Sequence, residues 1–154
     1  MQTIRAILID PFSKTVTEHR IEQGSDDGYS AMVRAIFNGE RGLITFSGIG
    51  AGHSIVVDDE GLMMDWDHQA FFQLGSGEAS ATFAGRALIV ASDSYGNTTP
   101  CRLPLSLVQS TCRWIEAKDV EVPAPVMTTI GKDGQLSEEL LAGTRTWNYK
   151  NQPV

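Results

Sequence analysis

The sequence predicts a single α+β domain over residues 1–122, followed by a C-terminal tail over residues 123–154. We expect a mixed or mainly antiparallel sheet that two helices cover. Three observations predict this class. Short apolar or alternating segments recur around two hairpins, two further segments show helical spacing, and too few crossover helices are available for a parallel sheet. With 154 residues, 42% of them hydrophobic, the chain is long enough to bury one core.

The first elements follow from the spacing of apolar residues. Residues 3–9 are an aliphatic run typical of a buried strand, and Asp10-Pro11 supplies a turn. Alternating residues 14–21 then complete a hairpin. After a glycine-rich break, apolar residues at helical spacing predict a helix over residues 28–37, which ends at Asn38-Gly39.

The middle of the chain predicts further short strands. They lie at residues 43–46 and 54–57, and a second hairpin is expected to join residues 55–57 to 62–64 through the turn at 58–61. Residues 87–91 are predicted to be the central strand, and Asp93-Ser94-Tyr95-Gly96-Asn97 its turn. A helix is expected over residues 106–115, with Ser106 as its N-cap and Cys112 on its apolar face.

The end of the chain predicts a docked tail. Residues 120–122 suit one more strand, and Pro123-Ala124-Pro125 predicts a stiff exit from the domain. A short helix is expected over residues 137–142. Trp147 and Tyr149 would be stranded in solvent on a free tail, so we expect them to pack on their own domain or to form a homo-oligomer.

Negative charge is concentrated in one part of the chain. The net charge is −7, and no Lys or Arg lies between Arg41 and Arg86. Five acidic residues of that window are our candidate binding residues: Asp58, Asp59, Glu60, Asp65 and Asp67. Such a chain lacks the basic surface that grips phosphates, which argues against direct nucleic-acid binding. The window is either a solvated face or a surface that binds a basic partner protein.

A glycine-rich segment offers an alternative ligand site. In Ser47-Gly48-Ile49-Gly50-Ala51-Gly52-His53, alternating glycines let the backbone approach an anion closely, and Trp66 or Tyr95 would stack on a base. The spacing is not that of a dinucleotide-binding or P-loop motif. A connector between two strands is the structural interpretation of the same residues.

The sequence contains no residue pattern typical of a metal site or of a catalytic site. Side chains that can bind a metal occur in Asp65-Trp66-Asp67-His68, and His53 or Asp58 could join them. Consecutive strand residues point to opposite faces of a sheet, so Asp67 and His68 could not both bind one ion, and we expect no metal. We expect no cofactor either. No nucleophile–base pairing, zinc-ligand spacing or phosphate cradle occurs, so no catalytic residue is assigned. The sequence therefore favours a protein that is not an enzyme.

The compartment is expected to be the cytoplasm. The start of the chain lacks the charged region of a secretory leader, and no run approaches the ~20 apolar residues that span a bilayer. Cys101 and Cys112 are then expected to be free thiols in a reducing environment.

Three segments of residues 3–116 resemble a family of small uncharacterised proteins of bacteriophages, prophages and plasmids. They are residues 4–18, with Asp-Pro and Lys-Thr-Val; residues 55–62, with Val-Asp-Asp-Glu-Gly-Leu; and residues 85–107, a strand, turn and helix. The family has no established activity, so the resemblance implies only a mobile-element protein in the bacterial cytoplasm.

Two hypotheses of function remain. The first is a non-enzymatic acidic interaction protein of a phage or other mobile element, which binds a host or self protein through residues 58–67. The alternative is a binder or sponge for a nucleotide-like small molecule, which uses residues 47–53.

Overall fold

The computed structural model describes residues 2–39, 42–63, 65–75, 81–120, 122–123 and 146–147. The chain forms two units, Met1–Ile115 and Glu116–Val154, each of which we describe by itself. The first unit is a mixed α+β fold built on antiparallel sheets, as the sequence predicts. None of the described helices is long and apolar enough to cross a membrane.

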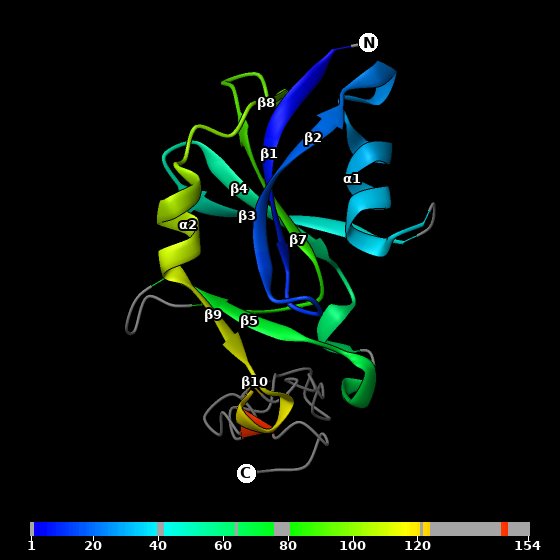
Figure 1. Cartoon of the computed structure of the whole chain (residues 1–154). Helices are drawn as coiled ribbons and strands as arrows, with labels where there is room; N and C mark the ends of the chain where they lie inside the picture. The colour runs from blue at the N-terminus through cyan, green and yellow to red at the C-terminus, as the bar shows by residue number, and fades with distance from the viewer. Residues whose placement is uncertain are drawn as a thin grey trace, which may run out of the picture. The chain divides into compact units, whose positions relative to one another are not determined.

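The main sheet has six strands in the order β2-β1-β7-β4-β3, with β8 paired to β7 (Figure 1). All of its pairings are antiparallel. The strands are β1 (Thr3–Asp10), β2 (Thr15–Glu22), β3 (Ile44–Gly50), β4 (His53–Asp58), β7 (Ala87–Ser92) and β8 (Thr98–Thr99).

Strand β7 is the centre of this sheet, which confirms the prediction for residues 87–91. All five of these residues are buried, since the sheet is covered on both faces. Ile89 pairs with Ile7 of β1 on one side and with Ile55 of β4 on the other. Neighbouring side chains of β7 then alternate between two separate apolar clusters.

Each face of the main sheet has its own cover. Helix α1 (Tyr29–Phe37) packs Met32 and Ile36 against the cluster that contains Leu88. Helix α2 (Leu105–Thr111) packs Val108 into the cluster on the opposite face, which contains Ile89. Figure 1 shows the two helices on opposite sides of the sheet.

A second sheet of three strands joins the α2 side, in the order β6-β5-β9. Its strands are β5 (Phe71–Leu74), β6 (Ala81–Ala84) and β9 (Cys112–Ile115). The prediction of one helix over residues 106–115 is wrong in its second half. The helix ends at Thr111, and Cys112–Ile115 instead pairs with β5, with Phe72 opposite Trp114. Its cap is Pro104, without a side-chain hydrogen bond, rather than Ser106.

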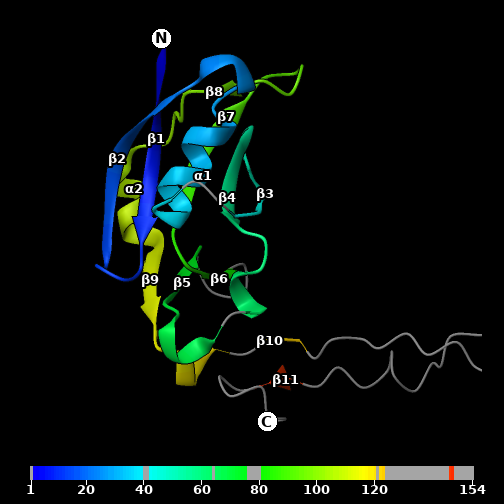
Figure 2. The ribbon, with the colours of Figure 1, turned by 90° about the vertical axis from the view of Figure 1, so that its right-hand side faces the viewer.

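The predicted hairpin between residues 55–57 and 62–64 does not form. Strand β4 pairs with β3 and β7, and the chain continues after β4 into a short 3₁₀ helix, Gly61–Met63. A buried strand that already has two neighbours leaves no free edge for residues 62–64. Figure 2, a view from the side, shows this part of the chain below β4.

The described part of the second unit is short. It contains a 3₁₀ helix, Ala117–Asp119, and two strands, β10 (Val122–Pro123) and β11 (Thr146–Trp147). The strands pair antiparallel, with Val122 opposite Trp147. The helix predicted over residues 137–142 and Tyr149 lie outside the described residues.

Candidate functional site

The five predicted acidic residues lie on one continuous stretch, which we call the acidic segment (residues 58–67). Asp58 ends β4, Asp59 and Glu60 follow it, and Asp65 caps a second 3₁₀ helix, Trp66–His68. The other four acidic side chains are exposed, and Asp58 is half-buried. The structure therefore places the first three of these residues at the end of β4, and the other two at the start of the 3₁₀ helix Trp66–His68.

Hydrogen bonds fix the backbone of the acidic segment. A carboxylate oxygen of Asp58 accepts the Glu60 N–H at 2.9 Å, and one of Asp65 accepts the Asp67 N–H at 3.0 Å. The Asp59 N–H donates to the Leu43 carbonyl at 2.9 Å. Asp58 and Asp65 thus shape the turns, whereas the carboxylates of Asp59, Glu60 and Asp67 make no hydrogen bond within the described part of the chain.

Trp66 anchors the acidic segment to the fold. The residue is 4% exposed, and its indole N–H donates to the Leu62 carbonyl at 2.8 Å. Its ring and that of Phe71 pack edge to face, with 5.0 Å between ring centroids and 61° between the ring planes. The indole is thus buried and its polar atom is hydrogen-bonded, so Trp66 serves packing here.

Apolar side chains stand beside the carboxylates. Met63 is 84% exposed, and Leu62 and Leu43 are 40% and 58% exposed. Among the described residues, the one basic side chain that contacts a carboxylate of the acidic segment is His68, whose Nε2 lies 3.7 Å from Asp65. The surface thus combines unneutralised negative charge with exposed apolar groups, a composition typical of protein contacts.

The glycine-rich segment is a hairpin rather than a free loop. Ser47, Gly48 and Gly50 belong to β3, and His53 begins β4. Only Ala51 and Gly52 connect the strands, with φ values of 54° and 75°. Two positive φ values in a two-residue connection define a type I′ turn, which matches the twist of the strands. The glycines therefore serve the turn and the irregular register between Gly48 and Gly50.

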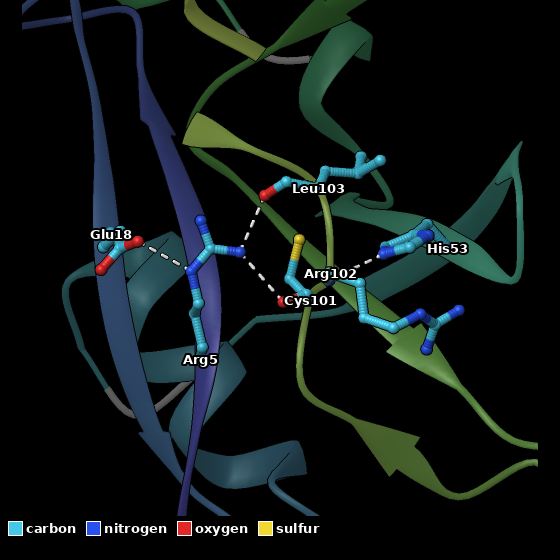
Figure 3. A network of polar contacts seen from close by, with 6 residues as sticks. All are labelled: Arg5, Glu18, His53, Cys101, Arg102 and Leu103. Carbon is cyan, nitrogen blue, oxygen red and sulfur yellow. Dashed lines mark hydrogen bonds and ion pairs between the residues drawn. The ribbon is translucent and has the colours of Figure 1, made fainter. Parts of the chain in front are cut away.

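His53 is part of a network that ties this hairpin to a distant segment (Figure 3). The ring is 4% exposed, its Nε2 accepts the Arg102 N–H at 3.0 Å, and its Nδ1 lies 3.0 Å from the Ala51 carbonyl. These roles place the proton on Nδ1 of a neutral imidazole. The Arg102 guanidinium also donates to the Ala51 carbonyl, at 3.0 Å. Both ring nitrogens are thus committed to the backbone.

Arg5 extends the same network on the other side of residues 101–103. One of its terminal nitrogens, Nη1, donates to the carbonyls of Cys101 and Leu103, at 2.9 and 2.8 Å, and Nε donates to Glu18 at 2.8 Å. Figure 3 shows the guanidinium between β2 and this segment. The segment between β8 and α2 is therefore held by an arginine on one side and a histidine on the other.

The remaining candidates for a ligand site are dispersed. Tyr95 is 89% exposed on the β7–β8 turn, where Asp93 accepts the backbone N–H groups of Tyr95 and Asn97. The Asn97 N–H is the main reason that the pKa of Asp93 is below its ordinary value. The turn interpretation of these residues is confirmed. The glycine-rich turn precedes the first residue of β4, whereas Trp66 follows its last residue. The length of the strand, about 20 Å, therefore separates the turn from the segment that carries Trp66.

Two clefts lie beside β3. The sequence pointed to Ser47 and Gly48 as part of a ligand site, but not to the other walls of either cleft. One, of about 500 Å³, is lined by Ser47, Gly48, Leu74, Phe83 and Leu107 on the α2 side. The other, of about 310 Å³, is lined by Asp26, Tyr29, Phe46 and Ser54 on the α1 side. Their walls come from elements that are distant in sequence, so no local motif could indicate them.

In the described part of the chain, no three or more His, Cys, Asp or Glu side chains lie close enough together to hold a metal ion. Both cysteines are free; Cys101 is buried, and burial raises the pKa of Cys112 to about 11.

In the comparisons with known proteins, no family model, no curated protein and no solved structure matches the chain.

Proposed function

We propose that this chain is a non-enzymatic protein-binding module that docks a basic partner on the acidic segment. The observation that carries the proposal is the placement of exposed carboxylates beside the exposed side chains of Leu62 and Met63. Protein interfaces combine an apolar centre with a polar rim, and charge on the rim steers the encounter.

Two further observations support a role without catalysis. Both nitrogens of His53 are engaged with the backbone, so the ring is not free to transfer a proton. The raised pKa of Cys112 keeps its thiol protonated at neutral pH, and a thiol is a far weaker nucleophile than a thiolate.

The expected partner follows from the same chemistry. Lys and Arg side chains would meet Asp59, Glu60 and Asp67, while an apolar side chain of the partner would cover Met63. An exposed ion pair is worth about 0.2–1 kcal/mol, so several are needed, and salt weakens them over a Debye length of about 8 Å. Following the resemblance to the phage family, we propose a bacterial host protein or a second protein of the element as the partner.

The test is a pull-down from bacterial lysate with a charge-matched pair of variants. Asp59→Lys combined with Glu60→Lys reverses the acidic segment and keeps the turn-forming Asp58. Glu22→Lys combined with Asp119→Lys changes the net charge equally at exposed sites elsewhere. We expect the first variant alone to lose its partners, and the wild type to lose them at high salt. Equal retention by both variants would refute the proposal.

A binder of small molecules is the second candidate, favoured by the cleft of about 500 Å³ that Ser47 and Gly48 line. Bound ligand raises the melting temperature by mass action. A thermal-shift panel of nucleotides and apolar metabolites separates the two candidates. A shift that Ser47→Phe abolishes supports this cleft, because Ser47 is opposite Ile55 of the α2-side cluster, and no shift favours the acidic segment.

A further inference from the structure

Strand β3 is an open edge of the main sheet, and it differs in chemistry from the other edge. Among the described residues it pairs only with β4. It carries no charged residue and no proline, whereas the opposite edge, β2, carries Glu18, Arg20 and Glu22. Charged side chains are the usual protection of an edge strand against pairing with another chain. The edge at β3 lacks this protection.

The register shows which backbone groups of β3 face outward. The Asp59 N–H donates to the Leu43 carbonyl, so residues 43 and 59 form a hydrogen-bonded pair. Such pairs alternate in an antiparallel ladder, so Thr45 and Ser47 also bond to β4. The N–H and C=O groups of Ile44, Phe46 and Gly48 therefore point away from β4, toward the open edge.

We propose that β3 pairs antiparallel with β3 of a second copy of this chain, centred on Phe46. In this register the two Phe46 residues are opposite each other, and Ile44 of each copy is opposite Gly48 of the other. The outward groups of three residues on each copy then meet without a gap. The irregularity after Gly48 ends the ladder there.

The side chains fit the same register. Phe46 is 48% exposed and lies on the α1 side of the sheet, where it lines the cleft with Tyr29. Side chains of residues directly opposite in a ladder are neighbours on one face, so the two phenyl rings would cover each other. An aromatic pair of this kind adds to the backbone hydrogen bonds.

Charge favours the antiparallel arrangement. The acidic segment begins at Asp58, opposite Ile44. With Phe46 at the centre, the two Asp58 residues are offset by four positions along the strands and by three strand spacings across them, a separation of about 20 Å. This is more than twice the Debye length of about 8 Å in physiological salt, so the acidic segments do not repel strongly. A two-fold axis also closes the assembly at two copies.

The proposal does not depend on the proposed function, because the acidic segments stay exposed at both ends of the joined strands. A dimer would present two of them to a partner.

The test begins with a variant that removes an outward donor. Gly48→Pro deletes the N–H that faces the second copy, and a Cβ at Gly48 meets nothing within 4 Å. Arg20→Pro is the matched control. Gln23 donates to Gln2, so the even-numbered residues of β2 face outward, and proline at residue 20 deletes an outward donor at the opposite edge. Mass is measured by sedimentation equilibrium over a range of concentrations, with circular dichroism as the check of folding.

A charge pair tests the register itself. Phe46→Lys and Phe46→Glu each place like charges opposite each other, and each should raise the dimer dissociation constant at least about tenfold. A mixture of the two variants should restore a mixed dimer, because the introduced lysine of one copy then faces the introduced glutamate of the other.

We expect the wild type and Arg20→Pro to dimerise and Gly48→Pro to be monomeric. A monomeric wild type, a dimer that survives the Phe46 substitutions, or a failure of the mixture to pair would overturn the proposal. A dimer formed instead through Trp147 would be indifferent to the β3 variants, and would overturn it as well. If Gly48→Pro does not fold, the Phe46 pair decides.

Discussion

Replacing Arg5 by methionine should lower the free energy of unfolding of the first unit by more than is usual for a partly exposed arginine. The substitution keeps an apolar stem and deletes the donors to the carbonyls of Cys101 and Leu103 and to Glu18. Hydrogen bonds from a charged donor contribute about 1.5–3 kcal/mol each. The Arg5 side chain is 20% exposed, so water replaces part of the loss. For the two carbonyls together we expect about 2–4 kcal/mol.

The matched control is Glu18→Gln, which removes only the ion pair. Glu18 is 52% exposed, and exposed pairs contribute about 0.2–1 kcal/mol. Arg5→Lys should fall between the two, because one ammonium group cannot reproduce the planar donors of a guanidinium. Urea unfolding measures all three, and the Arg5→Met midpoint should fall by about 1–2 M. If Glu18→Gln costs as much as Arg5→Met, the carbonyl bonds are not the source of the stability.

Three other expectations follow from single contacts. Gly61→Ala should cost about 1–3 kcal/mol in thermal unfolding, because a Cβ there would lie 2.8 Å from the Ala84 carbonyl oxygen; an unchanged melting temperature would contradict this. Partial burial raises the pKa of Asp10, but bonds from backbone amides and the Arg86 guanidinium outweigh it, so the pKa is lowered. The stability that Asp10 contributes is therefore present above its unfolded pKa of 3.8 and is lost as pH falls through the lower folded value. The Asp10→Asn variant should lose less stability than the wild type between pH 5 and pH 2. Urea unfolding at each pH measures this difference. Cys112, with its pKa of about 11, should react with iodoacetamide at pH 8 far more slowly than a free thiol does, and mass spectrometry of the alkylated protein would show whether it does.

The sequence predicted the elements whose pattern is local. The aliphatic run at residues 87–91 identified the central strand, and the spacing of Met32 and Ile36 identified α1. Asp93 identified its turn, because its side chain makes the hydrogen bonds that such turns need. These features depend on neighbours within a few residues.

The errors concern pairing between distant segments. Residues 106–115 fit one helix by spacing, but Cys112–Ile115 gains more from pairing with β5. Thr111 assists the end of the helix, since its hydroxyl bonds back to the Leu107 carbonyl at 2.9 Å. The glycine-rich residues looked like a loop because a type I′ turn and a loop require similar residues.

The candidate site was predictable in composition but not in form. The lack of Lys and Arg around residues 58–67 indicated the negative charge. The exposure of Met63 and the burial of Trp66 depend on how the segment packs against β5 and β6, which no local pattern records.

The position of β7 also determines when this sheet can form during synthesis. The hairpins β1–β2 and β3–β4 are each local in sequence. Strand β7, which lies between them in the sheet, is synthesised after both. Until residue 92 has left the ribosome, Ile7 and Ile55 have no common partner, and two separate hairpins are only marginally stable in water. Folding then waits on long-range contacts, which makes it slow and cooperative. Ile89→Val should accordingly slow refolding in stopped-flow experiments more than it speeds unfolding, because the arrival of this strand is the step that commits the chain.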